Sequence, residues 1–187
     1  MRIIAGSRRS LPLKTMAGEE VRPTTDRIKE TLFNILQDRI YGAYFLDLYA
    51  GSGQIGLEAL SRGASYAVFV EQGKKQAEII QENIRFTKFE RESLLLQTNV
   101  SAGIFRLSGK YRFDLIFADP PYKSRVFPQL LTDLAEARIL KPEGQVILEA
   151  DRREETGAFE DYGFSVAREK IYKTNKHDFL QRMEERP

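Results

Sequence analysis

Short apolar runs alternate with segments of helical periodicity through most of this chain, and this alternation constrains the fold more than any other feature. The runs are almost continuously apolar, which is typical of strands that are buried on both faces. Repeated strand and helix segments predict a parallel sheet with helices on both faces, that is, a doubly wound α/β fold. The expected core strands span residues 44–48, 66–70, 94–97, 113–118 and 145–149. The expected helices span residues 55–60, 73–86, 102–107 and 126–137, and two terminal strands span residues 163–171 and 176–181.

Residues 1–18, called here the amino-terminal arm, carry basic side chains and no acidic ones. Residues 2–4 and 11–14 predict the two strands of a hairpin within the arm. A basic arm suits a polyanion, although arginines that only keep a hairpin soluble give the same pattern. The basic residues of the arm are Arg2, Arg8, Arg9 and Lys14.

A helix is predicted next, from Thr24 or Thr25, either of which can cap it, to just before Gly42. Its apolar residues recur at helical spacing, at Ile28, Leu32, Ile35, Leu36 and Ile40. Hairpin and helix together form an amino-terminal extension, residues 1–41, ahead of a main domain, residues 42–187.

Composition excludes several kinds of site. The chain has no cysteine, so disulfides and thiolate metal sites are excluded. Its one histidine, His177, leaves little scope for a zinc site or a catalytic triad, and we expect no metal. No segment approaches the roughly 20 apolar residues of a membrane span, and the start lacks the apolar region of a secretory signal. We therefore expect a soluble cytoplasmic protein with no membrane partner.

Ligands of a doubly wound sheet bind beyond the carboxyl ends of its strands, so the residues that follow each strand are candidates for a site. The first core strand runs into a glycine-rich turn, and Glu71 follows the second strand, 20 positions after Gly51. A carboxylate there can bond both hydroxyls of a ribose. After the third strand, the Asn99 side chain and the following Val100 amide can read an adenine edge. The candidates in the glycine-rich turn are Asp47, Tyr49, Gly51, Ser52 and Gly53.

These three strand ends together predict an adenosine-containing ligand, although an ordinary turn or cap would explain each one alone. Asp47 immediately before the turn would repel the pyrophosphate of a nicotinamide dinucleotide. The same carboxylate suits the ammonium and sulfonium of S-adenosylmethionine. A kinase-like phosphate site is excluded, because no Gly-Lys-Ser/Thr follows the glycines.

The fourth strand ends in Asp119-Pro120-Pro121-Tyr122. Neither proline has an N–H, so the strand cannot continue its hydrogen-bond ladder and its carbonyls stay available. Asp119 and the Pro120 carbonyl can accept the two N–H groups of an exocyclic amine, while Tyr122 stacks on the ring that carries it. A rigid turn capped by an aspartate is the alternative interpretation.

The three motifs resemble the class I methyltransferases that act on exocyclic amino groups. The resemblance lies in residues 47–53, 69–71 and 119–122. Asp-Pro-Pro-Tyr also occurs in adenine-N6 DNA methyltransferases, so the motif does not indicate which base is methylated. Residues 148–151 match the family only loosely, and Asn99 stands where the family usually has aspartate.

Three amino-terminal segments resemble a smaller group of enzymes within this class. Residues 1–6 (MRIIAG), 22–27 (RPTTDR) and 30–34 (ETLFN) resemble the bacterial guanine-N2 methyltransferases of 16S, or small-subunit, ribosomal RNA. This resemblance runs from residue 1 to about residue 180. It implies a Rossmann-like sheet of seven strands, the last one antiparallel, that binds S-adenosylmethionine.

The resemblance also implies roles for particular residues. Asp119, Pro120, Pro121 and Tyr122 would hold the N2 amine of a guanine withdrawn from its helix. Arg2, Arg8 and Arg9 would contact RNA phosphates, and Arg22, Thr24 and Arg27 would help to close the rim of the site. The implied partner is 16S ribosomal RNA or an assembling small subunit, and we expect a monomer. An adenine or protein-glutamine methyltransferase and a non-catalytic RNA-binding module remain as alternatives.

Overall fold

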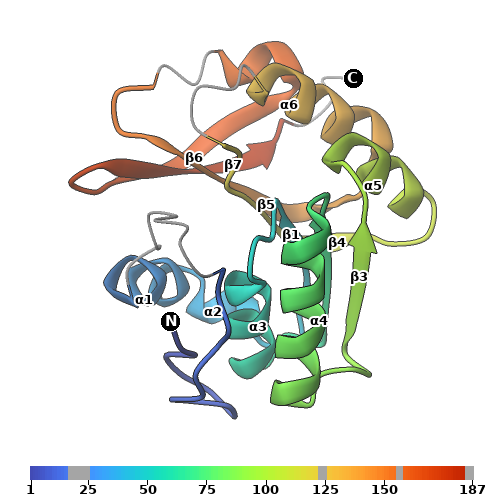
Figure 1. Ribbon diagram of the computed structural model, residues 1–187. Coiled ribbons are helices and arrows are strands. Elements are labelled where there is room, and N and C mark those ends of the chain that lie inside the picture. The colour runs from blue at the N-terminus through green and yellow to red at the C-terminus, as the bar shows by residue number, and fades with distance from the viewer. Residues whose placement is uncertain (17–25, 122–125, 155–157, 184–187) are drawn as a thin grey trace.

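Figure 1 shows the computed structural model, which describes residues 1–16, 26–121, 126–154 and 158–183. Its strands are β1 (Tyr44–Leu48), β2 (Tyr66–Glu71), β3 (Ser93–Gln97), β4 (Phe113–Ala118), β5 (Leu140–Asp151), β6 (Phe164–Ile171) and β7 (Asn175–Arg182). In the described part of the chain they form one seven-stranded sheet in the order β3-β2-β1-β4-β5-β7-β6. The pairs among β1 to β5 are parallel, whereas β7 is antiparallel to both β5 and β6. The predicted doubly wound sheet with an antiparallel last strand is confirmed.

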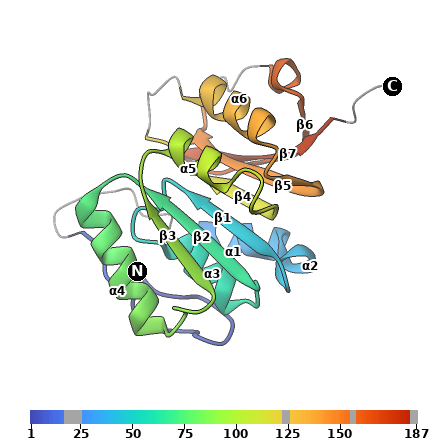
Figure 2. The same ribbon diagram turned by 90° about the vertical axis from the view of Figure 1, so that its right-hand side faces the viewer.

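Helices cover both faces of this sheet (Figure 2). They are α1 (Asp26–Ile35), α2 (Gln37–Ile40), α3 (Gln54–Ser61), α4 (Lys74–Thr87), α5 (Val100–Leu107) and α6 (Phe127–Ala137), with a short 3-10 helix η1 (Phe159–Tyr162). Successive strand residues point to opposite faces. Phe45, Phe69 and Phe117 therefore belong to one buried cluster with α1, α3 and α4, while Leu46 and Ile116 belong to another with α5 and α6.

The predicted amino-terminal helix is wrong in one respect, because the chain bends at Leu36 and divides into α1 and α2. The amide of Arg39 bonds the Leu36 carbonyl, so a new turn starts there. Leu36 and Ile40 are both buried despite the bend, which is why apolar spacing did not reveal it. The predicted caps Thr24 and Thr25 lie outside the described residues.

The fifth core strand starts earlier than predicted, at Leu140. Its pairing with β4 shifts register between Phe113↔Leu140 and Leu115↔Gln145. The extra residues bulge from the ladder, where Pro142 is tolerated although it lacks an N–H.

The described part of the amino-terminal arm folds back on itself without forming two regular strands. Arg2 and Pro12 form a single antiparallel bridge, and the Ile3 and Leu13 amides bond the carbonyls of Leu11 and Met1, each at 3.0 Å. The predicted strands at residues 2–4 and 11–14 are thus reduced to one bridge. Proline at one of the paired positions removes a ladder donor, which limits the length of the pairing.

The arm is attached to the same core as the sheet. Ile3 and Leu13 belong to the buried cluster that contains Phe33 of α1 and Phe45 of β1. The division into an extension, residues 1–41, and a main domain, residues 42–187, stays a proposal.

Candidate active site

The glycine-rich turn and Asp119-Pro120 follow neighbouring strands at one edge of the sheet. β1 and β4 are paired in parallel, with Leu48 opposite Ala118 at their carboxyl ends. The turn leaves β1 at Tyr49, and Asp119 leaves β4 one residue after Ala118. Two motifs separated by about 70 positions in the sequence therefore lie side by side.

The turn itself requires glycine. Gly51 and Gly53 have φ values of 56° and 77°, in the left-handed region that glycine adopts without strain. Tyr49 also has a positive φ, 59°, which is uncommon for a residue with a side chain. The Gly53 amide bonds the Ala50 carbonyl at 2.7 Å, and Gly53 is followed directly by α3.

Two predicted cofactor carboxylates hold this turn in place. Asp47 Oδ2 accepts a hydrogen bond from the Gly56 amide at 2.9 Å. Glu71 accepts one from the Gly51 amide at 2.9 Å through Oε2 and one from the Gly73 amide at 2.7 Å through Oε1. Both side chains therefore shape the backbone on which a ligand would rest.

The other predicted cofactor residues lie around the same edge. Asn99 caps α5, because its Oδ1 accepts a hydrogen bond from the Ala102 amide at 2.9 Å. Val100 is the first residue of that helix. The Ser52 carbonyl accepts a hydrogen bond from Asn83 Nδ2 at 2.9 Å, which ties the turn to α4.

Three carboxylates gather on one face of this edge: Asp47, Asp119 and Glu149, called here the acidic edge. Asp119 and Glu149 come directly after the registered pair Ala118↔Leu148 of β4 and β5. Burial raises the pKa of the Asp47 carboxyl to about 8, against the Gly56 hydrogen bond, which lowers it. Burial also raises the pKa of Asp119 well above its ordinary value, and the negative charges of Glu149 and Asp47 add to the effect. Such crowding of carboxylates favours a cationic ligand.

Sequence reasoning missed the residues that hold Glu149. Its Oε1 accepts a hydrogen bond from Asn175 Nδ2 at 2.6 Å, and its Oε2 lies 3.0 Å from His177 Nε2. The signal available in the sequence is a glutamate at the end of an apolar core strand, in a segment, residues 148–151, that matches the family only loosely.

Of the predicted amine-binding residues, Asp119 is partly buried, Pro120 is buried and Pro121 is exposed. Tyr122 lies outside the described residues, as do Arg22 and Thr24 of the predicted rim. Among the predicted RNA contacts, Arg9 and Arg27 are exposed.

Two arginines predicted to contact RNA take part in the fold. Arg2 Nε bonds Asp26 Oδ2 at 3.1 Å in an exposed ion pair. Arg8 Nε donates to the Thr87 carbonyl at 2.8 Å, and its guanidinium lies 5.2 Å from the centre of the Phe89 ring. These contacts attach the arm to α1 and to the end of α4.

A buried charge network attaches the arm to α3. Glu58 accepts hydrogen bonds from the amides of Ile4 and Ala5, at 2.7 and 3.1 Å. Lys29 Nζ donates to the Arg2 carbonyl at 2.5 Å and lies 3.7 Å from Glu58 Oε2. Burial lowers the pKa of Lys29, and the charge of Glu58 opposes this shift.

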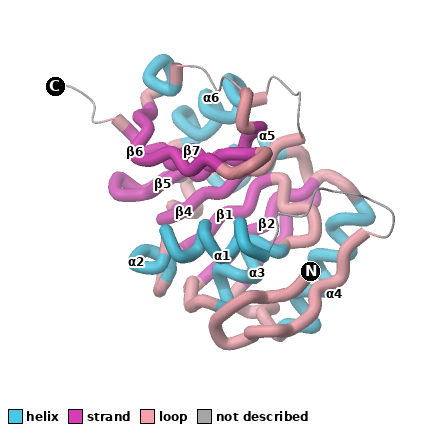
Figure 3. Tube along the Cα trace, turned by 90° about the vertical axis from the view of Figure 1, so that its left-hand side faces the viewer, coloured by secondary structure: helices cyan, strands magenta, loops and turns pink. Residues whose placement is uncertain are grey.

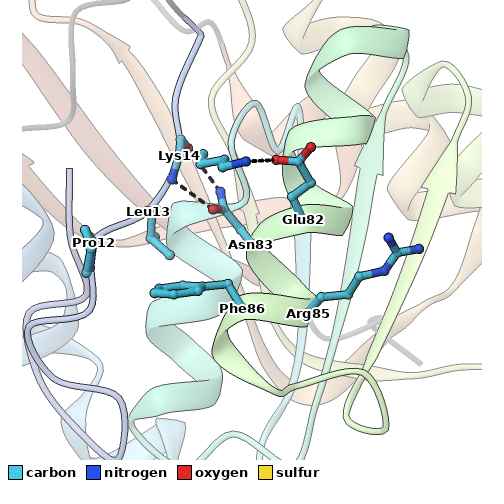
Figure 4. Close-up of a pocket in the computed structure, with 7 residues that line it drawn as sticks. All are labelled: Pro12, Leu13, Lys14, Glu82, Asn83, Arg85 and Phe86. Carbon is cyan, nitrogen blue, oxygen red and sulfur yellow. Dashed lines mark hydrogen bonds and ion pairs between the residues drawn. The ribbon is translucent and has the colours of Figure 1, made fainter.

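A separate cavity of about 520 Å³ lies between the arm and α4, away from the acidic edge. Figure 4 shows the Phe86 ring beneath Leu13, and Lys14 bonded to Asn83 and paired with Glu82. The Lys14 ammonium lies 2.5 Å from Glu82 Oε2. None of the predicted cofactor or amine residues lines this cavity. Among its polar side chains, Lys14, Glu82 and Asn83 make contacts between the arm and α4.

Neither a metal site nor a membrane span is found in the part of the chain that the structure describes. No group of three or more potential ligands among His, Asp and Glu is positioned there to hold a metal ion. No described helix is long and apolar enough to cross a membrane.

Known proteins resemble this chain along almost its whole length. A family model described as "Conserved hypothetical protein 95" matches residues 1–181. Ribosomal RNA small subunit methyltransferase D of Haemophilus influenzae is 36% identical over 153 residues, which cover 81% of this chain and 79% of that protein. The protein of the same name from Escherichia coli is 32% identical over 151 residues, covering 81% and 75%. The solved structure of yhhF from Escherichia coli matches with a TM-score of 0.85 and 30% identity, covering 99% of both chains.

Proposed function

We propose that this chain, which belongs to the family described as Conserved hypothetical protein 95, is an S-adenosylmethionine-dependent methyltransferase of the guanine N2 amine in ribosomal RNA. The family resemblance expected from the sequence is confirmed. The observation that carries the mechanism is that the glycine-rich turn and Asp119-Pro120 follow paired strands at one sheet edge. Cofactor and substrate amine can therefore meet there.

The acidic edge fits the proposed cofactor. Asp47 and Asp119 are crowded carboxylates, and a ligand that carries positive charge relieves their repulsion. When bound, S-adenosylmethionine supplies a methyl group on a positively charged sulfur. We propose that Asp47 faces its cationic end and that Glu71, already fixed by two amides, bonds its ribose.

The remaining cofactor contacts are proposed for the residues beside the turn. The Asn99 side chain and the Val100 amide would meet the adenine ring. Tyr49, Ser52 and the glycines Gly51 and Gly53 would form the surface on which the ligand rests. The positive φ values of the two glycines leave the backbone there open to close approach.

The amine would be held by the segment after β4. Asp119 and the Pro120 carbonyl accept its two N–H groups, which orients a nitrogen whose lone pair is delocalised into the ring. Positive charge develops on this nitrogen as the methyl group arrives, and the carboxylate stabilises it. Pro121 would rigidify the segment, and we propose that Tyr122 stacks on the guanine.

The substrate is proposed to be 16S ribosomal RNA, free or in an assembling small subunit, met in the cytoplasm by a monomer. The named relatives support the small subunit. Arg9 and Arg27 are exposed and suited to RNA phosphates, and Arg22 and Thr24 are proposed for the rim. Arg2 and Arg8 would contribute only with the part of the guanidinium that their present partners leave available.

The test is methyl transfer from labelled S-adenosylmethionine to small subunits isolated from cells that lack the protein. Asp119→Ala is expected to lower transfer about 100-fold or more, because an oriented acceptor is lost. Calorimetry should still show cofactor binding, and no binding of NAD. Asp38→Ala, an exposed acid on α2, is the matched control and should behave as wild type.

Other outcomes point to other functions. Near wild-type transfer by Asp119→Ala would contradict the amine-binding role. Methylated adenine or glutamine among the products would identify one of the alternative substrates. RNA binding without cofactor binding would indicate a non-catalytic module.

A further inference from the structure

A buried chain of hydrogen bonds ends beside Asp119, and the mechanism above makes no use of it. Glu149 Oε1 accepts a hydrogen bond from Asn175 Nδ2 at 2.6 Å, and Glu149 Oε2 lies 3.0 Å from His177 Nε2. The other ring nitrogen, His177 Nδ1, lies 3.2 Å from the Tyr172 hydroxyl. Glu149 and Asn175 are each 4% exposed and His177 is fully buried. Burial, with the charge of Glu149, raises the pKa of Tyr172 to about 12, so this hydroxyl keeps its proton.

One arrangement of protons satisfies all these contacts. The Tyr172 hydroxyl donates to His177 Nδ1, and His177 Nε2–H donates to Glu149. The His177 ring is fixed by edge contacts with Phe117 and Phe179, whose ring centres lie 6.0 and 6.4 Å away. Every donor in this chain therefore points toward the Glu149 carboxylate.

The sheet register sets this carboxylate next to Asp119. Figure 3 shows β4, β5 and β7 side by side. Glu149 is registered opposite His177, and Asp119 and Glu149 come directly after the pair Ala118↔Leu148. Asp119, Glu149 and His177 therefore form a row across three strands, on the face that carries Phe117 and Ile147.

The charges around this row are mostly negative. From the described residues, Asp119 meets the charges of Glu149 on β5 and Asp47 on β1, and Tyr172 meets those of Glu149 and Arg168 on β6. Lys176 and Asp178 alternate with His177 along β7 and pair with each other at 3.1 Å on the opposite face.

The network also keeps an acceptor to spare. Asn175 Oδ1 is buried and has no hydrogen-bond partner within the described part of the chain. Buried polar groups with a purely structural role are normally satisfied. The Asn175 amide oxygen therefore leaves room for one further hydrogen-bond donor beside Glu149.

We propose that Glu149, fixed by Asn175 and His177, is a positioning residue that makes Asp119 the acceptor of the proton leaving the substrate amine, an assignment that rests on the function proposed above. In this step the amine nitrogen bonds the methyl carbon, and the carbon–sulfur bond breaks with its electron pair left on sulfur. The nitrogen becomes positive, one N–H bond breaks with its pair returning to nitrogen, and the proton goes to an Asp119 oxygen.

The change of charge during transfer explains why Asp119 takes the proton at that moment. Before transfer, the positive sulfur favours an ionised Asp119, which can accept the amine N–H. After transfer that charge is gone, while the negative charge of Glu149 beside Asp119 favours a protonated Asp119. Glu149 thus acts through Asp119 and does not touch the amine.

The test is Glu149→Gln, with Glu169→Gln on β6 as the matched control. Glu149→Gln removes a negative charge beside Asp119, so the acid limb of the rate profile is expected to move to lower pH by about one unit. The rate at the plateau should fall severalfold, because Asp119 becomes a weaker base. Glu169, paired with Lys176 and 43% exposed, should leave the profile unchanged when replaced.

A binding measurement gives a readout that does not depend on turnover. Calorimetry in two buffers of different ionisation enthalpy reports the protons released on binding. Wild type is expected to release more protons with S-adenosylmethionine than with S-adenosylhomocysteine, which lacks the positive sulfur. Glu149→Gln should reduce this difference, because its Asp119 is already ionised in the free protein.

His177 supplies a second set of variants. His177→Gln keeps a donor to Glu149 and should retain the wild-type profile, whereas His177→Ala should shift it in the direction of Glu149→Gln. Identical pH profiles and proton release in wild type and Glu149→Gln would overturn the inference and leave the methyltransferase function standing. Failure of the wild type both to bind the cofactor and to transfer methyl groups would remove the proposed function instead.

Discussion

Two buried glutamates, Glu58 on α3 and Glu149 on β5, have surroundings of opposite character. Glu58 lies 2.7 Å from Arg62 Nε and 3.7 Å from the Lys29 ammonium. Two backbone amides of the arm donate to it as well. Glu149 instead accepts hydrogen bonds from the side-chain amide of Asn175 and the imidazole of His177, and its ionisable neighbour is the Asp119 carboxyl, whose pKa is raised.

The difference separates a charge that holds the fold from one that serves a site. The charge of Glu58 is balanced where it is buried, so the network can fasten the arm to α1 and α3 at all times. The negative charge of the acidic edge around Glu149 is compensated only when a cationic ligand binds. Buried charge that is left uncompensated at a strand end is a mark of ligand binding.

The largest effect is expected from Glu58→Ala. It leaves Lys29 buried without its carboxylate and removes the acceptor of two arm amides. The free energy of unfolding should fall by about 3–5 kcal/mol. The melting temperature should then drop by about 10 °C.

Glu78→Ala, an exposed glutamate on α4, is the control and should melt within about 1 °C of wild type. A similar small change for Glu58→Ala would mean that the arm does not depend on this network. Glu58 could then no longer be contrasted with Glu149 as the glutamate that stabilises the fold.

The sequence predicted the sheet well because each core strand is a short apolar run. β1 and β4 match the predicted ranges residue for residue. The bend at Leu36 and the early start of β5 were missed, since both depend on contacts with other elements. Apolar spacing continues through the bend, and Pro142 argues against a strand unless its partner skips it.

The acceptor site was predicted only in part, for a similar reason. Asp119 and the glycine-rich turn follow strand ends and could be found by position. Glu149 and His177 are separated by 28 positions, and only the register of β5 and β7 brings them together. No local pattern carries that register, so a lone histidine gave no sign of its partner.

The second effect concerns Asp47, which belongs to the acidic edge. Its pKa is raised from 3.8 to about 8, so the folded protein binds this proton more tightly than the unfolded chain. The stability that this residue contributes is full below pH 3.8 and is lost as the pH rises through about 8. Asp47→Asn should therefore melt about 5 °C above wild type at pH 8, and the gain should vanish as the pH falls toward 4.

Thermal melts of both proteins from pH 4 to pH 8.5 measure this difference, and cofactor affinity should fall in the same variant. The amide oxygen introduced by Asp47→Asn can still accept the Gly56 hydrogen bond, so the comparison isolates the charge. A pH-independent difference would show that Asp47 is compensated in the free protein, as Glu58 is.

The smallest effect distinguishes two neighbouring arginines of the arm. Arg8 bonds the Thr87 carbonyl and stacks over Phe89, so Arg8→Ala should cost about 1 kcal/mol and lower the melting temperature by about 3 °C. Arg9 is exposed, and Arg9→Ala should leave the melting temperature unchanged. RNA binding by Arg9→Ala should weaken, with the salt dependence reduced by about one charge. If instead Arg8→Ala alone weakened RNA binding and left the melting temperature unchanged, the arm would be an RNA-binding surface. The network around Glu58 would then hold a binding surface in place, and Glu58 and Glu149 would differ less in role than their surroundings indicate.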